Sequence, residues 1–441
     1  MFSKVKSLVL IGLLICAVML IGVVPLVAQA SPPKEIKIGV IMPLSGALAS
    51  TGKDLRGGYE LAEDIINNKY PGLDITIAGW EGIPNLGGAK IKLIFMDHRA
   101  DPARGADLAK RLIMDEKVIA LLGCYNSSVT KTVSTVAERY GIPMLNPNSS
   151  SPALTMRGLN WFWRVSPHDG SFTVDLFNFL EGLTKGKVRG VGKVPKEEIE
   201  TLAVAAENTE YGSAAKELIE EIAPEYGYQV LESFKYPHQA PDLTSEAGRL
   251  MASGAKVYLF VPYISDAILY IRTLKSLKAA PNIIWAQDAG FINPDFPKLG
   301  KDISGTITRS VFIPKMGEKK PTAAKIDKIF KEKTGHDFTG ASARSFTGAQ
   351  AIAHVLNEAG STDPEALQKT LNEIRVPGKD LVVAWEGIEF GGARPGEKGQ
   401  NILATGMIGQ WQWKNGENTL EVVYPFDFAT ADFIYPFPGW K

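Results

Sequence analysis

Residues 36–46 have the sequence IKIGVIMPLSG. The apolar run up to Met42 predicts a buried strand, and a few small polar residues follow it before a helical pattern begins at Lys53. The same order of apolar strand, small polar residues and helix recurs at 118–128 and at 142–152. Because the loops after parallel strands gather at one edge of an open α/β sheet, the three loops predict a binding site for a small molecule.

The helices that follow these strands indicate which part of a ligand would bind there. The first turn of a helix leaves its N–H groups unpaired and carries a partial positive charge, so it attracts an anion. Serines occur in all three loops and add hydroxyl donors. The loops therefore predict a ligand that is held by a carboxylate or a similar polar oxygen.

Strand and helix patterns alternate along most of the chain. The first series predicts strands over 36–42, 90–96, 118–122 and 142–145, and a second series from 201 to 285 has the same rhythm. Strands that alternate with helices predict a parallel sheet with both faces covered, so two series predict two α/β domains. Two stretches rich in Gly and Pro predict insertions, at 70–88 and 391–399.

The first thirty residues have the pattern of a secretory signal. Lys4 and Lys6 precede an almost wholly apolar run over 8–27, and Ala28-Gln29-Ala30 offers small residues at the cleavage positions. We expect a signal peptide over 1–30 and a periplasmic or extracellular mature protein. The apolar run is also long enough to span a bilayer, so an uncleaved anchor is the alternative.

Charge and cysteine content exclude some classes of protein. The chain balances 48 basic against 48 acidic residues, which gives no support to nucleic-acid or polyanion binding. Its 2 cysteines are Cys16 and Cys124, and cleavage of the signal would remove the first of them. We therefore expect no disulfide in the mature protein, whose stability must come from the size of its cores.

The sequence lacks the common catalytic motifs. It has no G-x-S-x-G elbow, no Walker loop and no H-E-x-x-H pair, and its 5 histidines are scattered without metal-ligand spacing. These absences favour a binding protein over an enzyme. A secreted hydrolase that uses Cys124, at a predicted helix N-terminus, or a serine is the alternative.

Four stretches carry a resemblance to a known family: 38–46, 123–128, 140–147 and 149–158. Together they resemble the solute-binding proteins of branched-chain amino-acid and amide ABC transporters, which are periplasmic binding proteins of the type I fold. The resemblance implies two doubly wound, Rossmann-like α/β lobes joined by three crossover segments, with the ligand between them. It implies a first lobe over 31–164 and 313–378 and a second lobe over 165–312 and 379–441.

The resemblance also implies which first-lobe residues bind the ligand. In the family, a serine after the third strand and a residue in the loop after the fourth strand bind the ligand carboxylate; these positions fall on Ser127 and Ser150. The same loop offers a backbone carbonyl to the ligand amine at Asn148, and Ser149 is a neighbouring candidate. Helix capping is the structural alternative for Ser127.

In the second lobe, the resemblance implies an acidic residue that holds the ligand ammonium and an aromatic wall around it. The acidic position falls on Asp288, and the aromatic positions fall on Tyr211 and Tyr263. The structural alternatives are a surface turn for Asp288, a helix start for Tyr211 and core packing for Tyr263.

These expectations combine into one function. We expect a monomeric carrier that captures an amino acid, amide or small carboxylate without a cofactor or metal, and delivers it to an ABC transporter permease. The alternative from another class is a sensory module that uses the same cleft to report to a receptor or regulator.

Overall fold

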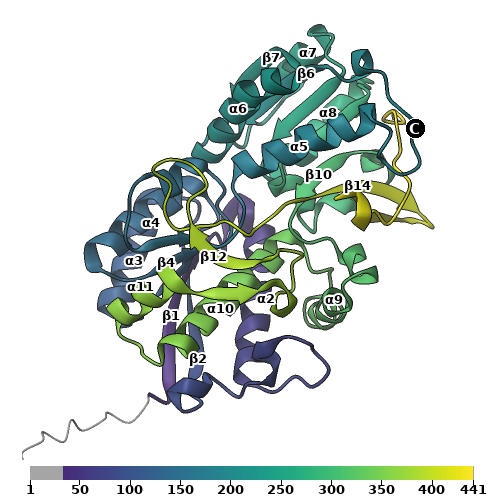
Figure 1. The fold of residues 1–441 in the computed structure, drawn as a ribbon. Helices are drawn as coiled ribbons and strands as arrows, with labels where there is room; N and C mark the ends of the chain where they lie inside the picture. Colours follow the sequence, from purple (N-terminus) through teal and green to yellow (C-terminus); the bar gives the residue numbers. More distant parts are fainter. Residues whose placement is uncertain (1–32, 441) are drawn as a thin grey trace, which may run out of the picture. The chain divides into compact units, whose positions relative to one another are not determined.

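The computed structural model describes residues 33–440, and from Lys34 onward the chain forms one unit that is built on two sheets (Figure 1). The signal peptide expected over 1–30, and Cys16 within it, lie outside the described residues. Among the helices of the described part, none is both long enough and apolar enough to cross a membrane.

The first sheet has eight strands in the order β11-β12-β13-β5-β4-β3-β1-β2. Its parallel part consists of β1 (Glu35–Met42), β2 (Lys90–Asp97), β3 (Leu121–Gly123), β4 (Met144–Asn146) and β5 (Phe162–Arg164). A short strand, β13 (Gln400–Asn401), runs parallel to β5. The sheet ends with two antiparallel pairs that join β13 to β12 (Gly387–Gly391) and β12 to β11 (Arg375–Pro377).

Helices cover both faces of this sheet. On one face α2 (Ala49–Asn67) packs against α10 (Gly340–Ala359), and on the other α3 (Pro102–Met114) packs against α4 (Ser127–Tyr140). Alternation along β1 supplies both cores, because Ile38 and Val40 belong to the first and Ile41 to the second. The remaining helices of this half are α9 (Pro321–Thr334) and α11 (Pro364–Glu373).

The second sheet has seven strands in the order β15-β14-β10-β9-β8-β6-β7. Five are parallel: β6 (Thr201–Glu207), β7 (Gln229–Tyr236), β8 (Val257–Val261), β9 (Ile283–Ala286) and β10 (Ile307–Ser310). The antiparallel hairpin β14 (Met407–Lys414) and β15 (Glu417–Tyr424) closes one edge. The helices of this half are α5 (Asp169–Thr184), α6 (Glu210–Ile222), α7 (Thr244–Ala252) and α8 (Ile264–Ser276).

Three segments connect the two halves. The chain passes from β5 to α5, returns from β10 to α9, and passes again from β13 to β14. We call the half with the first sheet the first lobe and the half with the second sheet the second lobe. The expected fold class, two α/β lobes with three crossover segments, is confirmed.

One expected lobe boundary is wrong. Residues 387–401 were expected in the second lobe, but β12 and β13 belong to the first sheet. Gln400 pairs with Arg164 of β5, and the Asn401 side chain donates to the Val165 carbonyl at 2.9 Å. A strand of two residues has no hydrophobic alternation, so its sheet partner was not visible in the sequence.

The expected insertions are packed parts of the first lobe. In the stretch 70–88, Ile77 and Ile83 are fully buried, and two 3-10 turns, Thr76–Gly79 and Pro84–Leu86, pack against α2 and α10. The stretch 391–399 lies between β12 and β13, where its Glu397 side chain is buried. Both stretches therefore contribute to the fold of this lobe.

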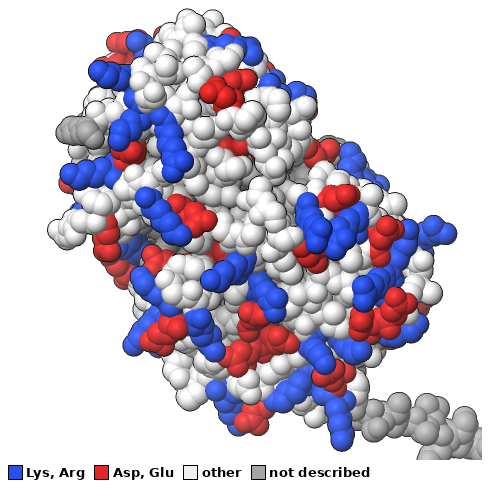
Figure 2. Space-filling view, turned by 180° about the vertical axis from the view of Figure 1, so that it is seen from behind, with Lys and Arg blue, Asp and Glu red and all other residues white. Residues whose placement is uncertain are grey.

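Charged side chains of both signs are interspersed on the face that Figure 2 shows. No single-sign field covers the described part of that face, which agrees with the even balance of charges in the sequence.

Candidate ligand-binding site

A hollow with an empty volume of about 250 Å³ lies where the carboxyl ends of the strands of both sheets meet. The first lobe lines it with Tyr125, Ser127, Asn148, Ser150 and Arg344, and the second lobe with Tyr211, Tyr263, Asp288, Ala289 and Arg309. We call it the interlobe hollow. A larger space of about 840 Å³ beside the second crossover contains none of the residues expected to bind a ligand.

Six of the seven residues expected at the site line the interlobe hollow. They are Ser127, Asn148, Ser150, Tyr211, Tyr263 and Asp288. The seventh, Ser149, differs from the expectation because its hydroxyl is used elsewhere: it donates to the Cys124 carbonyl at 2.7 Å and lies 2.5 Å from Thr130 Oγ1. Ser149 therefore ties the loop after β4 to the loop after β3, away from the hollow.

The first-lobe loops are held in place by short-range contacts. Asn126, not Ser127, occupies the N-cap position of α4, and the Ser127 hydroxyl accepts a hydrogen bond from Ser151 N at 3.4 Å. The Asn148 side chain donates to the Ala341 carbonyl of α10 at 3.1 Å. This contact uses the side chain of Asn148 and not its backbone carbonyl. Helix α10 can pack closely against the loop after β4 because residue 348 is glycine. A Cβ at this position would lie 2.8 Å from the Pro147 ring.

Three tyrosines form one wall of the hollow. The ring of Tyr263 lies 5.4 Å from that of Tyr125 and 5.5 Å from that of Tyr211, measured between centroids. Burial raises the pKa of all three hydroxyls, so they are neutral donors and acceptors at physiological pH. Because Tyr125 belongs to the first lobe and the other two to the second, this wall spans the lobes.

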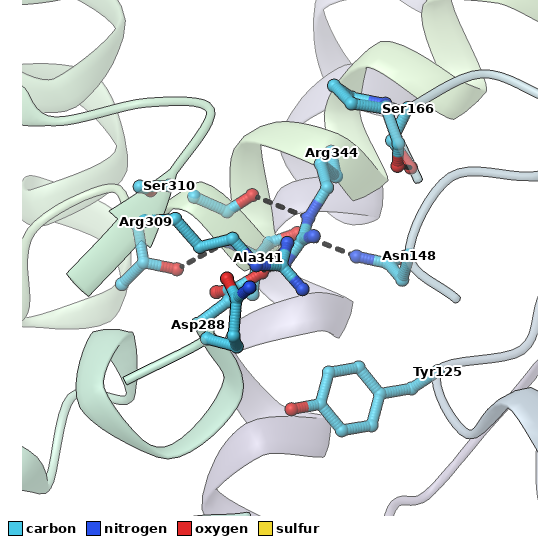
Figure 3. A network of polar contacts seen from close by, with 12 residues as sticks. Tyr125, Asn148, Ser166, Asp288, Arg309, Ser310, Ala341 and Arg344 are labelled. Atoms are coloured by element: carbon cyan, nitrogen blue, oxygen red, sulfur yellow. Dashed lines mark hydrogen bonds and ion pairs between the residues drawn. The ribbon is translucent and has the colours of Figure 1, made fainter. Parts of the chain in front are cut away.

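A buried network of charges also lines the hollow (Figure 3). One oxygen of Asp288, Oδ2, lies 2.7 Å from Arg344 Nη2 and 3.3 Å from Arg309 Nη1. Arg309 also donates to Asp169 at 2.6 Å and lies over the Phe172 ring at 3.7 Å. All four charged side chains are at most 4% exposed. We expected the Asp288 carboxylate to bind a ligand ammonium. In the structure it is already paired with two cations of the protein, Arg309 and Arg344.

Asp288 also has an unusual backbone. Asp288 has a φ of 69° and Ala289 a φ of 38°, which are positive values that residues other than glycine rarely adopt. Such strain persists only where the surroundings hold the residue, and it is concentrated at ligand clamps and active sites. The backbone thus identifies Asp288 as a position that the fold constrains closely.

A family model described as periplasmic binding protein matches residues 35–402 of this chain. The chain belongs to the periplasmic binding protein family. The resemblance that the sequence motifs carried is therefore confirmed.

Curated relatives of this periplasmic binding protein align along nearly the whole chain. Leu/Ile/Val-binding protein homolog 8 from Brucella abortus (strain 2308) is 26% identical over 401 residues, which are 90% of this chain and 92% of the relative. Leu/Ile/Val-binding protein homolog 7 from Brucella suis biovar 1 (strain 1330) is 26% identical over 428 residues, with 94% and 98% covered.

Solved structures share the fold at lower identity. The leucine-binding protein LivK from Thermotoga maritima has a TM-score of 0.70 at 20% identity and covers 89% of this chain and 99% of its own. A solute-binding protein of an ABC transporter from Rhodopseudomonas palustris BisB5, in complex with 3,4-dihydroxybenzoic acid, has a TM-score of 0.71 at 16% identity, with 91% and 99% covered. LivJ from Streptococcus pneumoniae, in complex with isoleucine, has a TM-score of 0.68 at 16% identity, with 89% and 100% covered.

Sequence reasoning about this periplasmic binding protein missed the two arginines. Arg309 lies in β10, whose four residues are all buried, and Arg344 lies in the first turns of α10 among small residues. The signal was a single charged residue inside each otherwise buried pattern, because arginine is almost never fully buried unless it is paired. Both arginines line the hollow, where each of them pairs with Asp288.

The loop that carries Ser150 is supported from behind by a second buried network. Arg164 donates to the Ser151 carbonyl at 2.6 Å and to Thr155 Oγ1 at 2.8 Å, and burial lowers its pKa to about 9. Glu397 accepts from Thr155 Oγ1 at 3.0 Å and from Arg394 at 2.6 Å. Burial alone would raise the pKa of Glu397, but Arg394 lowers it to about 2. The stretch 391–399 thus fixes the ligand loop.

One group among the described residues has the composition of a metal site. The ligand atoms of Glu207, His238 and Asp266 lie within 4.8 Å of one another, next to the Tyr263 ring. His238 Nδ1 is 3.1 Å from Glu207 and 3.6 Å from Asp266. Burial alone would lower the pKa of His238, but the two carboxylates raise it to about 9. An imidazolium ion therefore satisfies this group without a metal.

Proposed function

We propose that this protein captures a small carboxylate or amide-like solute, of the size of an amino acid, between its lobes and delivers it to the permease of an ABC transporter. The observation that carries the proposal is the interlobe hollow. Each lobe contributes five of its ten lining residues, and six of the ten were expected at the site. Hydroxyl, amide, carboxylate, guanidinium and aromatic groups all line this hollow, a combination that suits a small polar solute.

The first lobe offers the groups that a carboxylate needs. Ser127 is the first residue of α4, so the unpaired N–H groups of that helix lie beside its hydroxyl. Ser150 comes from the neighbouring loop and lines the same hollow. We assign the ligand carboxylate to Ser127 and Ser150 because hydrogen bonds to an ionised acceptor are the strong ones. We assign the Asn148 carbonyl to a donor on the adjacent ligand atom, because Asn148 lines the same hollow.

Contacts between the lobes surround the hollow and support a closing motion. Glu210 of the second lobe accepts from Ser151 at 3.3 Å and from Lys131 at 3.4 Å, and Asn293 donates to Thr51 at 2.8 Å. A ligand that contacts both lobes binds the closed form better than the open form, so it shifts the population towards closure. The permease would then distinguish loaded from empty protein by shape.

The relatives support the class of ligand. Names of curated relatives refer to leucine, isoleucine and valine, and structural neighbours hold isoleucine or 3,4-dihydroxybenzoic acid. These ligands share a carboxylate on a compact body. We propose the same feature for the ligand of this protein, and we propose a periplasmic or extracellular location after signal cleavage.

The alternative of a hydrolase that uses Cys124 has little physical support. The Cys124 side chain is fully buried, and burial raises the pKa of its thiol far above the ordinary value. A reactive cysteine needs an exposed thiolate. A sensory module with the same cleft remains the second candidate, and the presence of a partner permease distinguishes the two functions.

The test begins with the ligand itself. Protein purified without refolding is denatured, and the released small molecules are identified by mass spectrometry. Isothermal titration calorimetry then measures binding of that compound and of a panel of amino acids, amides and aromatic acids. Absence of binding by every carboxylate and amide would contradict the proposal. Stimulation of a reconstituted permease ATPase by the loaded protein would separate a carrier from a sensor.

A further inference from the structure

The pair Asp288–Arg344 crosses between the lobes. Asp288 follows β9 in the second lobe, whereas Arg344 lies on α10 of the first lobe, and their closest atoms are 2.7 Å apart. Arg309, which lies 3.3 Å from the same carboxylate oxygen, comes from the second lobe. In this arrangement of the lobes, a cation of the first lobe therefore contacts Asp288, where a ligand ammonium was expected.

The other carboxylate oxygen of Asp288 can accept a hydrogen bond from a ligand. Oδ1 is buried and has no hydrogen-bond partner, although Asp288 lines the hollow. A buried acceptor without a partner is costly, so a donor from the ligand would relieve that cost. The donor therefore meets a carboxylate that Arg344 and Arg309 already pair, and both arginines also line the hollow.

Charge decides which donor fits. An ammonium beside Asp288 Oδ1 would be buried next to a carboxylate that two guanidinium ions already neutralise, and burial of a charge without its own counter-ion is costly. Asp169 supplies no further counter-ion, because it balances Arg309 at 2.6 Å, and the two aspartates and two arginines together have no net charge. A hydroxyl donates one hydrogen bond to Oδ1 and adds no charge.

We infer that the ligand group that faces Asp288 is a neutral hydroxyl, and that the protein selects hydroxy acids over amino acids of the same shape. The inference rests on the proposed function, since it concerns a second polar group of the same solute. It assigns Arg344 a role in specificity: this residue takes the place of the ligand cation when the lobes close.

Matched pairs of ligands test the inference. Calorimetry compares L-leucic acid with L-leucine, L-phenyllactic acid with L-phenylalanine, and 4-(hydroxymethyl)benzoate with 4-(aminomethyl)benzoate. In at least one pair the hydroxyl compound should bind about tenfold or more tightly than the ammonium compound. Equal binding, or tighter binding of the ammonium compound, in every pair that binds would overturn the inference and leave the proposed function intact. Binding of none of these compounds would overturn the inference, and the wider panel of carboxylates and amides would then decide the proposed function by itself.

Variants of Arg344 connect the preference to its cause. Arg344→Met removes the cation and should shift the preference at least tenfold towards the ammonium compound, because Asp288 then keeps only Arg309. Arg344→Lys retains the charge and should retain the preference for the hydroxyl. The matched control is Arg272→Met on the exposed face of α8. This control should keep the ligand preference of the wild type. An unchanged preference in folded Arg344→Met would overturn the assignment; if that variant does not fold, the ligand pairs decide alone.

Discussion

Replacement of Glu397 by glutamine tests whether the stretch 391–399 supports the ligand loop. The lowering of its pKa from 4.5 to about 2 corresponds to about 3 kcal/mol of stability at neutral pH. Its partner Arg394 is 35% exposed, so water screens part of this interaction and we expect a loss of about 2 kcal/mol. Glutamine has nearly the same size, so the loss measures charge rather than packing.

The assay is urea unfolding of wild type and Glu397→Gln at several pH values. The lowered pKa of Glu397 in the folded state stabilises the protein fully above pH 4.5, and this stabilisation is lost as pH falls through about 2. The difference in unfolding free energy between wild type and variant should therefore shrink between pH 7 and about pH 3. Glu389→Gln is the matched control, because its pair with Arg375 is 3.4 Å long and 73% and 38% exposed. We expect that control to cost about 0.5 kcal/mol or less. An equal loss in both variants, or a difference that does not depend on pH, would refute the reasoning.

Three further outcomes are expected. Ser127→Ala should weaken binding of the carboxylate ligand about tenfold or more by calorimetry, since it removes a hydrogen bond to a charged group; unchanged affinity would contradict the assignment. His238→Gln should lower the melting temperature at pH 6, and the difference should vanish as pH rises through about 9, because the raised pKa of His238 stabilises the fold fully only below 6.5. Cys124→Ala should retain ligand binding, and loss of binding in a folded variant would reopen a role for the thiol.

The architecture was predictable because it depends on local patterns. The alternation in β1 and the apolar sequence of β8 identify buried parallel strands without any knowledge of their partners. The loops after β3 and β4 follow from the same patterns, so Ser127 and Ser150 were found together. What brings these loops to one hollow is the parallel topology, which the alternation of strands and helices already implied.

Other parts depend on contacts between segments far apart in the sequence. The short strand β13 shows no alternation, and its place follows from pairing with β5, over two hundred positions earlier. Ser149 was misjudged because neighbouring serines in one loop look alike in sequence, whereas the fold turns one hydroxyl towards the Cys124 carbonyl. The arginines on Asp288 come from β10 and α10, so only the assembled hollow shows that its carboxylate is already paired.

The position of Arg344 relates ligand choice to lobe closure. A ligand that supplied its own cation to Asp288 would compete with Arg344 for one carboxylate, and the lobes would lose a contact that joins them. A ligand with a neutral donor leaves that pair intact and occupies the remaining oxygen. Binding and closure then reinforce each other, because the ligand favours a closed form that the protein stabilises with its own ions. An interlobe ion pair can thus act on specificity through the free energy of closure as well as through direct contact.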